Sequence, residues 1–150
     1  MKSPALFALA AACTALWLPV PAAAQFAKTE DAIKYRQSAM FIQSQHLARL
    51  GAMANGRVPF DAPAAVANAE VIAQISKLPW SGFGPGSEGG KAKPDIWKEQ
   101  ARFKELGDRL VTESDRLVVA AKSGNLDTLK AAVGAVGETC KACHDSFRSR

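Results

Sequence analysis

Residues 126–147 read LDTLKAAVGAVGETCKACHDSF, and this stretch decides the fold. Apolar residues recur along it with alternating gaps of three and four, at Leu126, Leu129, Val133, Val136, Cys140, Cys143 and Phe147. This heptad spacing places a continuous apolar seam on one face of an α-helix. Because such a seam has to pack against other helices, the stretch predicts a helix over residues 126–148 inside a helical bundle.

Three other stretches show helical periodicity. Residues 62–78 begin at a predicted N-cap, Asp61, and are stopped by Pro79. Residues 95–122 are ended by Gly124. Residues 28–53 begin at a predicted N-cap, Thr29, and their stripe is interrupted by polar side chains; it consists of Ile33, Gln37, Met40, Ser44, Leu47 and Gly51.

No segment alternates apolar and polar residues with a period of two, so no strand is predicted. Four amphipathic helices joined by three connections predict an all-α fold, an antiparallel up-down four-helix bundle. The longest connection, residues 79–94, contains Gly84, Gly86 and Gly89, which match a dinucleotide-binding fingerprint by letter. That fingerprint has to follow a strand and open a helix. We therefore interpret residues 79–94 as a structured crossover loop.

The first 24 residues have the pattern of a secretory signal peptide. Lys2 precedes an apolar stretch over residues 5–18, and the small residues 22–24 form a cleavage site after Ala24. A membrane anchor is disfavoured, because fourteen residues at about 1.5 Å each fall short of a hydrocarbon core about 30 Å thick. A lipoprotein signal at Cys13 is the weaker alternative. We expect a mature domain of residues 25–150 in the periplasm.

Composition narrows the function further. The chain has 150 residues, 48% of them hydrophobic, which suits one domain and excludes a multidomain enzyme. Its net charge of +5 comes from Lys and Arg spread over all four predicted helices, so no nucleic-acid interface is predicted. No membrane contact is expected after signal cleavage. Of three cysteines, cleavage leaves two, Cys140 and Cys143.

Residues 140–144 form a C-x-x-C-H motif: Cys140, Lys141, Ala142, Cys143 and His144. Two thiols three residues apart share one helix face and can form thioether bonds to one haem, whose iron the next imidazole can reach. A thioredoxin-type pair would follow a strand, and a zinc site needs about four ligands. A disulfide at this spacing would close a tiny loop. The motif therefore predicts one covalently bound haem c per chain, with His144 as axial ligand.

A second axial ligand is expected from another helix or not at all, because only residues 145–150 follow the motif. The candidates are Met40, His46 and Met53. Since a helix turns about 100° per residue, His46 and Met53 point well away from a haem that Met40 faces. Arg36 lies beside Met40, and its guanidinium matches a haem carboxylate. Arg148, one turn past His144, is either a helix C-terminal cation or a group near the proximal face.

Three segments together resemble bacterial cytochromes c′: YRQS at 35–38, LPW at 78–80 with FGPG at 83–86, and CKACHDSFR at 140–148. The resemblance implies a periplasmic homodimer that associates through its first two helices. It implies five-coordinate, high-spin iron that binds nitric oxide and carbon monoxide. By position, it assigns Cys140 and Cys143 to haem attachment and His144 to the iron. It places Arg36 and Gln37 at the haem edge, Met40 in the distal pocket and Arg148 near the proximal pocket.

Two functions remain open at this point. One is a gas-binding haem protein with five-coordinate iron that takes part in electron transfer or nitric oxide tolerance. The other is a low-spin, six-coordinate electron carrier with Met40 as sixth ligand, similar to cytochrome c-556, whose basic surface would steer an acidic periplasmic redox partner. An enzyme is not expected, because Gln37 and Ser44 on the Met40 face do not form an acid–base pair.

Overall fold

The computed structural model describes residues 25–150, so the predicted signal peptide lies outside the described residues. The elements are α1 (Thr29–Ala54), α2 (Ala62–Ile75), the 3₁₀ helix η1 (Pro79–Phe83), α3 (Asp95–Lys98), α4 (Gln100–Lys122) and α5 (Leu126–Phe147). Each long helix packs against the one before and after it, and α5 returns to α1. This arrangement confirms the predicted all-α up-down four-helix bundle.

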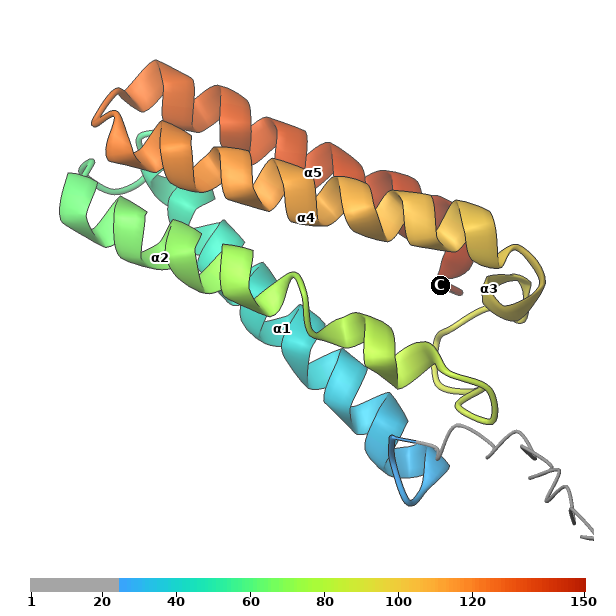
Figure 1. The fold of residues 1–150 in the computed structure, drawn as a ribbon. Helices are drawn as coiled ribbons and strands as arrows, with labels where there is room; N and C mark the ends of the chain where they lie inside the picture. The colour runs from blue at the N-terminus through green and yellow to red at the C-terminus, as the bar shows by residue number, and fades with distance from the viewer. Residues whose placement is uncertain (1–24) are drawn as a thin grey trace, which may run out of the picture.

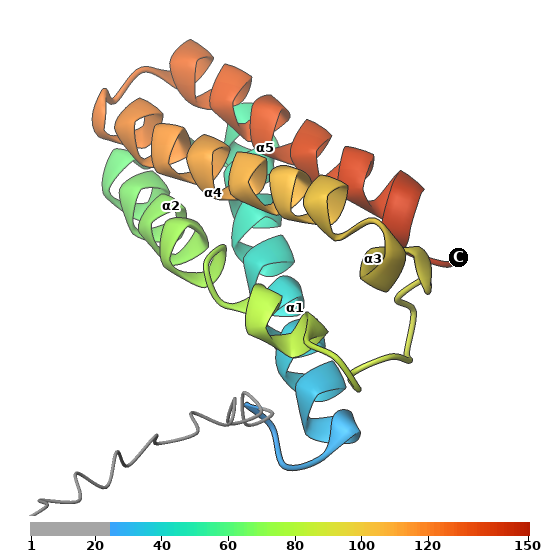
Figure 2. The ribbon, with the colours of Figure 1, turned by 45° about the vertical axis from the view of Figure 1, so that its right-hand side comes forward.

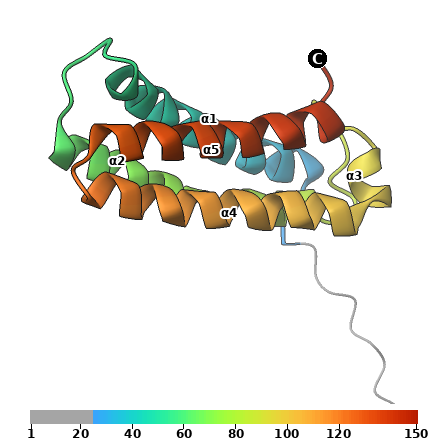
Figure 3. The same ribbon diagram turned by 90° about the horizontal axis from the view of Figure 1, so that it is seen from above.

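The four helices are not equally close to one another (Figure 1). Helices α4 and α5 lie side by side and antiparallel, with the most extensive contact in the molecule, and α2 packs on both α1 and α4. Helix α1 crosses the others at an angle, which is plainest in Figures 1 and 2 and can also be followed from above in Figure 3. Its contact with η1 is more extensive than its contact with α5. The bundle is therefore tight on the α4 side and looser between α1 and α5.

A core of branched aliphatic side chains holds the helices together. Leu50, Ile72, Leu117, Leu129 and Val136 are fully buried, and each long helix contributes at least one of them. Small residues on α2, Ala65 and Ala69, are also fully buried and let its neighbours approach closely. The predicted seam of α5 supplies Leu129, Val136 and Phe147 to the interior, whereas Leu126, the first residue of the helix, is exposed.

The buried stripe of α1 differs from the predicted one. The interior side is formed by Ala32, Arg36, Ala39, Gln43 and Leu50, each one position before a residue of the predicted stripe, and by Met53 and Ala54 at the end of the helix. The predicted residues Ile33, Met40 and Leu47 are only half-buried. The prediction was wrong because two of the inward positions are polar and two are alanines, so the strongest apolar pattern lies at the border of the interior rather than at its centre.

The helix ends confirm some predicted caps and correct others. Asp61 accepts a hydrogen bond from the Ala64 amide at 3.0 Å, as an N-cap does, and Gly124 has a φ of 66° just past α4. Thr29 is not a cap but the first residue of α1, and its hydroxyl donates to the Gly86 carbonyl at 2.8 Å. Asn125, which the sequence did not single out, caps α5 by accepting from the Thr128 amide.

Two predicted helices are shorter than expected. Helix α2 ends at Ile75, and residues 79–83 turn into η1 (Figure 2). The predicted helix over 95–122 is divided at Glu99, whose backbone (φ −109°, ψ 46°) leaves the helical region. The short α3 follows the crossover loop instead, burying Ile96 and directing the Trp97 ring nitrogen to donate to the Gly84 carbonyl.

The close approach of η1 to α1 requires glycine. A Cβ atom at Gly82 would lie 2.8 Å from the Ala32 carbonyl oxygen and 3.0 Å from the Arg36 Cβ. No other residue fits there without moving η1 away from α1. Beside this contact, Trp80 packs on Gly107 of α4, so η1 lies between α1 and α4.

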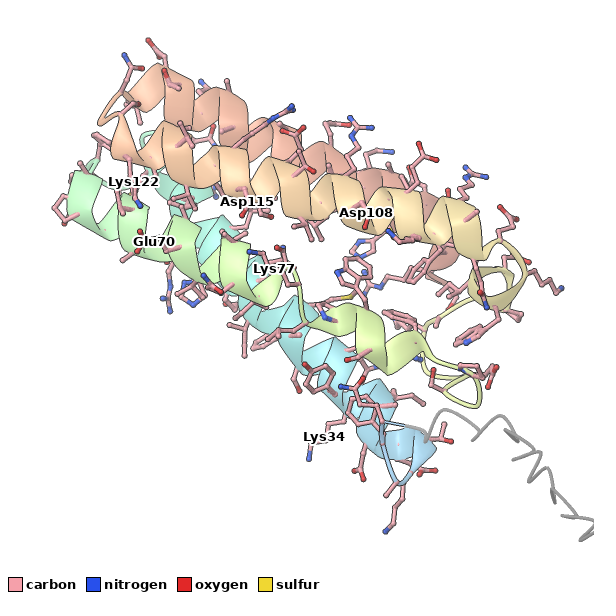
Figure 4. The ribbon with its side chains drawn as sticks, in the orientation of Figure 1. Lys34, Glu70, Lys77, Asp108, Asp115 and Lys122 are labelled. Carbon is pink, nitrogen blue, oxygen red and sulfur yellow. The ribbon has the colours of Figure 1, made fainter. Side chains whose placement is uncertain are left out.

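Charged residues cover the outer faces. Lys122 pairs with Glu70 of α2 at 2.9 Å, and Asp115 pairs with Lys77, just after α2, at 3.9 Å, so one ion pair connects α4 to α2 and another connects it to the segment that follows α2 (Figure 4). All four side chains are about half exposed, so each pair contributes little to stability. Within residues 25–150, no helix is long and apolar enough to cross a bilayer.

Candidate functional site

A cleft of about 450 Å³ opens between α1 and the C-terminal half of α5. It continues into an inner cavity of about 340 Å³ that reaches toward α4 and η1. Four residues line both spaces: Met40 and Ser44 on the α1 wall, and Cys143 and His144 on the α5 wall. The combined volume lies in the range of cofactor sites.

The two thiols of the C-x-x-C-H motif lie on the cavity side of α5. Cys140 lines the inner cavity and Cys143 lines both spaces, and they form no disulfide with each other. Burial raises the pKa of both thiols, for Cys143 to about 11, with the charge of Cys140 as a second cause. Both sulfurs are therefore neutral thiols at pH 7, side by side on one wall, where they can add to two vinyl groups of one planar ligand.

His144 stands next to these thiols at the mouth of the cleft. Burial lowers the pKa of its imidazole, and the nearby charge of Arg148 lowers the pKa further, against a smaller opposing effect of Asp145. A lowered pKa favours the neutral imidazole, which is the form that binds a metal ion. Arg148 is exposed and lines the same cleft as His144.

The opposite wall is formed by α1, and of its three candidate ligands only Met40 lines the cleft. Met53 is buried in the core, and His46 donates from its Nδ1 to the side-chain oxygen of Asn68, 2.8 Å away. This agrees with the helical spacing, which separates both from the direction of Met40. Gln37 is exposed and lines the outer cleft, where the Gly90 backbone passes close to its amide.

Arg36 is buried, and its guanidinium fastens the crossover loop to α1. Its Nη1 donates to the Gly82 and Ser87 carbonyls at 2.6 and 2.7 Å, and its Nη2 donates to the Gly89 carbonyl at 2.8 Å. The guanidinium also lies 4.5 Å from the centre of the Phe83 ring. Burial lowers the pKa of Arg36, partly offset by Glu88. Of five N–H donors, these three bonds leave two, on Nε and Nη2, at the edge of the cleft that Arg36 lines.

The other end of the crossover loop holds the end of α5. Lys93 Nζ donates to the Asp145 and Ser146 carbonyls, each at 3.1 Å, and the Lys93 amide donates to the Phe147 carbonyl. Ala92 pairs with Arg148 in a single antiparallel bridge. A cation at the C-terminus of a helix also complements the helix dipole. We call residues 82–93 the strap, since they connect the α1 wall to the α5 wall.

Aromatic rings line the inner end of the outer cleft. Phe103 of α4 lies edge-on to Phe83 and to Phe147, with ring centres 4.8 and 5.4 Å apart, and all three rings line the cleft. Trp80 extends the cluster to the inner cavity, 5.7 Å from Phe103. The sequence alone did not predict that these rings are in contact, because they come from three different elements.

Sequence reasoning also missed Gln43. It lies one turn after Met40, is 4% exposed, and lines the inner cavity. Its amide nitrogen is buried without a hydrogen-bond partner in the described part of the chain. The available signal was its spacing, since Arg36 and Gln43 are seven residues apart on the buried face of α1.

The residues present fit a haem. The walls are largely apolar, two thiols and a neutral imidazole meet on one of them, and the inner cavity is lined by Gln43, whose buried amide nitrogen has no partner among the described residues. Among residues 25–150, no group of three or more His, Cys, Asp or Glu side chains could hold a bare metal ion. A four-helix bundle that presents a C-x-x-C-H motif to such a cleft defines the class of protein: a c-type haem protein built on a helical bundle.

Comparison with known proteins narrows the class to a family. The family model described as Cytochrome C' matches residues 31–148. A cytochrome c′ of Alcaligenes xylosoxydans xylosoxydans is 48% identical over 126 residues, covering 84% of this chain and 99% of the relative. One from Rubrivivax gelatinosus is 44% identical over 129 residues, covering 84% and 100%. A solved nitric oxide complex of a mutant cytochrome c prime from Alcaligenes xylosoxidans has a TM-score of 0.81 and 47% identity, covering 84% and 99%.

The chain belongs to the cytochrome c′ family. Membership gives it one covalently bound haem c per chain and the character of a haem protein without enzymatic activity. Both statements agree with the predictions from the sequence. Members of the family are typically periplasmic.

Proposed function

We propose that this chain is a periplasmic haem protein that binds nitric oxide and carbon monoxide at a five-coordinate iron. Bound haem supplies the iron at which a diatomic ligand attaches and which changes oxidation state. Cys140 and Cys143 attach the haem, and His144 provides the axial nitrogen. The observation that supports this most is the cleft itself: both thiols and the imidazole lie on the α5 wall, opposite Met40. The nitric oxide complexes of two mutants of one relative, 47% identical in sequence, point the same way.

The surrounding residues orient the haem. Arg36 keeps two N–H donors for a haem carboxylate while its other donors hold the strap, and Gln37 stands beside it at the haem edge. Arg148 contributes positive charge on the His144 side. Met40 occupies the wall opposite His144 and restricts which ligands can enter. Nitric oxide tolerance is the role that fits a site to which Met40 restricts access.

We further propose that two copies associate through α1 and α2, and that residues 1–24 direct export. Ile42 on α1 is 42% exposed in the single chain and lies outside the cleft, so a partner can cover it, whereas the exposed Phe41 lines the cleft. A basic surface suits an acidic periplasmic redox partner if the protein also transfers electrons. These assignments rest on the family and on the sequence of the leader.

The second candidate function depends on Met40 as a ligand of the iron. Its side chain lines both parts of the cleft together with His144, so its sulfur can serve as sixth ligand as well as a steric guard. In that case the iron is six-coordinate and low-spin, and the protein is an electron carrier similar to cytochrome c-556. The two functions differ in whether Met40 binds the iron.

Optical spectra of the purified holoprotein, oxidised and reduced, with and without nitric oxide, separate them. The proposal expects a high-spin spectrum that changes on addition of nitric oxide. It also expects Met40→Ala to leave the spin state unchanged and to speed ligand binding. A low-spin reduced spectrum with a sharp α band and no response to nitric oxide would establish the electron carrier instead. His46→Ala, remote from the cleft, is the matched control.

A further inference from the structure

Gln43 is a buried polar residue with no structural task in the described chain. Its side chain is 4% exposed, and its amide nitrogen has neither solvent contact nor a hydrogen-bond partner. A buried donor without an acceptor is destabilising, and an apolar side chain of similar length would avoid that cost. The amide therefore fits a site where an acceptor arrives with a ligand.

The hydroxyl and indole donors around the inner cavity are already engaged. Ser44 donates to the Phe41 carbonyl at 2.7 Å, and Thr139 donates to the Val136 carbonyl at 2.7 Å. The Trp80 ring nitrogen donates to the Ser76 carbonyl, also at 2.7 Å. Of the amide and hydroxyl donors that line this space, Gln43 alone keeps its N–H groups uncommitted.

Gln43 also lies on the wall where a ligand would bind. It follows Met40 by three residues, so the two side chains are neighbours on one face of α1. Cys140, Cys143 and His144 line the same cavity from α5. With His144 as axial ligand, the α5 wall is proximal and the α1 wall is distal, which places Gln43 beside Met40 on the distal side.

We propose that Gln43 is a specificity-determining residue: its side-chain amide donates a hydrogen bond to a small diatomic ligand held on the Met40 side of the haem. This inference rests on the proposed function, because it needs a haem with His144 as its axial ligand. A lone donor in an otherwise apolar pocket strengthens the binding of ligands with accessible lone pairs and slows their release. Met40 limits entry to the site, and Gln43 retains what has entered.

Carbon monoxide is the probe, since its C–O stretching frequency falls when a donor approaches its oxygen. We expect the C–O band of the reduced holoprotein to move to higher frequency in Gln43→Met, and carbon monoxide to dissociate several-fold faster. In deuterated buffer the wild-type band shifts, because N–D replaces N–H, and Gln43→Met loses this shift. Gln45→Met, an exposed glutamine on the same helix, is the matched control and keeps the wild-type band.

The stability of the ligand-free holoprotein gives a second readout that does not depend on ligand binding, because Gln43→Met removes the unpartnered buried amide. We expect the urea midpoint of the ligand-free holoprotein to be higher in Gln43→Met than in the wild type. When carbon monoxide is bound, we expect this difference in midpoint to be smaller, because the wild-type amide then has an acceptor. A C–O band that is unchanged by Gln43→Met and insensitive to deuterium, in a protein that binds carbon monoxide, overturns this inference and leaves the proposed function standing. A holoprotein that shows no C–O band at all overturns both.

Discussion

At the scale of single residues, the unusual feature is that polar side chains occupy inward positions of α1. Arg36 and Gln43 are both buried. Arg36 donates to carbonyls of the strap, and the amide nitrogen of Gln43 has no partner among the described residues. Arg36 replaces the hydration of three strap carbonyls with charge-assisted hydrogen bonds, which are stronger than neutral ones. The polar positions of α1 therefore serve the cleft and the strap rather than the core.

Replacing Arg36 with Met tests the strap contact. The change leaves the Gly82, Ser87 and Gly89 carbonyls without their donor, so we expect the free energy of unfolding to fall by about 3 kcal/mol, since each hydrogen bond to a charged group contributes roughly 1.5–3 kcal/mol and the losses are not additive. Arg36→Lys should recover only part, because an ammonium lacks the planar fork. Urea unfolding of the holoprotein measures both.

Arg49→Met is the control for this change, since Arg49 is an exposed arginine on the same helix. We expect it to alter the unfolding free energy by less than about 0.5 kcal/mol. Equal losses in Arg36→Met and Arg49→Met would show that the strap bonds do not stabilise the fold.

At the scale of elements, the strap is the segment that holds the two walls of the cleft in place. One end binds Arg36 on α1, and the other end, through Lys93, binds the last carbonyls of α5. Its conformation depends on glycine at Gly90, where φ is 61° and a Cβ would lie 3.0 Å from the Gln37 amide. The glycine-rich sequence thus belongs to a structural connection rather than to a phosphate-binding loop.

Lys93 allows a test of the α5 end. In Lys93→Met two carbonyls at the end of α5 lose their donor, and we expect a loss of about 1 kcal/mol together with faster amide exchange over residues 144–148. Hydrogen-exchange mass spectrometry of the holoprotein measures the local effect. Lys130→Met, an exposed position on α5, should leave exchange in this segment unchanged. If amide exchange over residues 144–148 is as slow in Lys93→Met as in Lys130→Met, Lys93 does not hold the end of α5.

Gly82 tests the contact between η1 and α1. An alanine there places its Cβ 2.8 Å from the Ala32 carbonyl oxygen, so Gly82→Ala should destabilise the protein by about 1–3 kcal/mol, as overpacked positions do. Gly134→Ala is the matched control, because its Cβ meets nothing within 4 Å on an exposed face of α5. That change should stabilise by about 0.5–1 kcal/mol through helix propensity. Thermal unfolding of both variants checks the difference in sign.

At the scale of the whole molecule, the bundle is asymmetric. Helix α1 contacts η1 more extensively than α5, and this opens the cleft on one side while α2, α4 and α5 stay closely packed (Figures 1 and 3). Ile42 of α1 is exposed and lies outside the cleft. Helix α1 therefore carries both one wall of the haem site and the face that we assign to the dimer.

Ile42→Glu tests that face. If α1 lies in the dimer interface, a carboxylate at its centre is desolvated in both copies, and we expect the dimer dissociation constant to rise at least about tenfold, or 1.4 kcal/mol. Sedimentation equilibrium measures it. Val119→Glu on α4, at a position 71% exposed, is the control and should leave the dissociation constant unchanged. A chain that is monomeric before substitution would contradict the proposed dimer.

The sequence by itself determined the class of fold and the chemistry of the α5 wall. Heptad spacing in residues 126–147 and the C-x-x-C-H motif are local patterns, so a helix, two thiols on one face and an adjacent imidazole follow without knowledge of any neighbour. Met40 could also be separated from His46 and Met53 by helical angle alone. The boundaries of α1 and α5 were predicted to within one residue for the same reason.

Only the tertiary structure decided what the polar residues of α1 do. The sequence does not show that Arg36 and Gln43 are buried, because the carbonyls that Arg36 binds and most of the cavity that Gln43 lines are supplied by distant elements. The division of residues 95–122 into α3 and α4 likewise goes with the burial of Ile96 and with the hydrogen bond of Trp97 to the strap. Periodicity reports which face of a helix is apolar, whereas burial of a polar side chain depends on what the rest of the chain places opposite it.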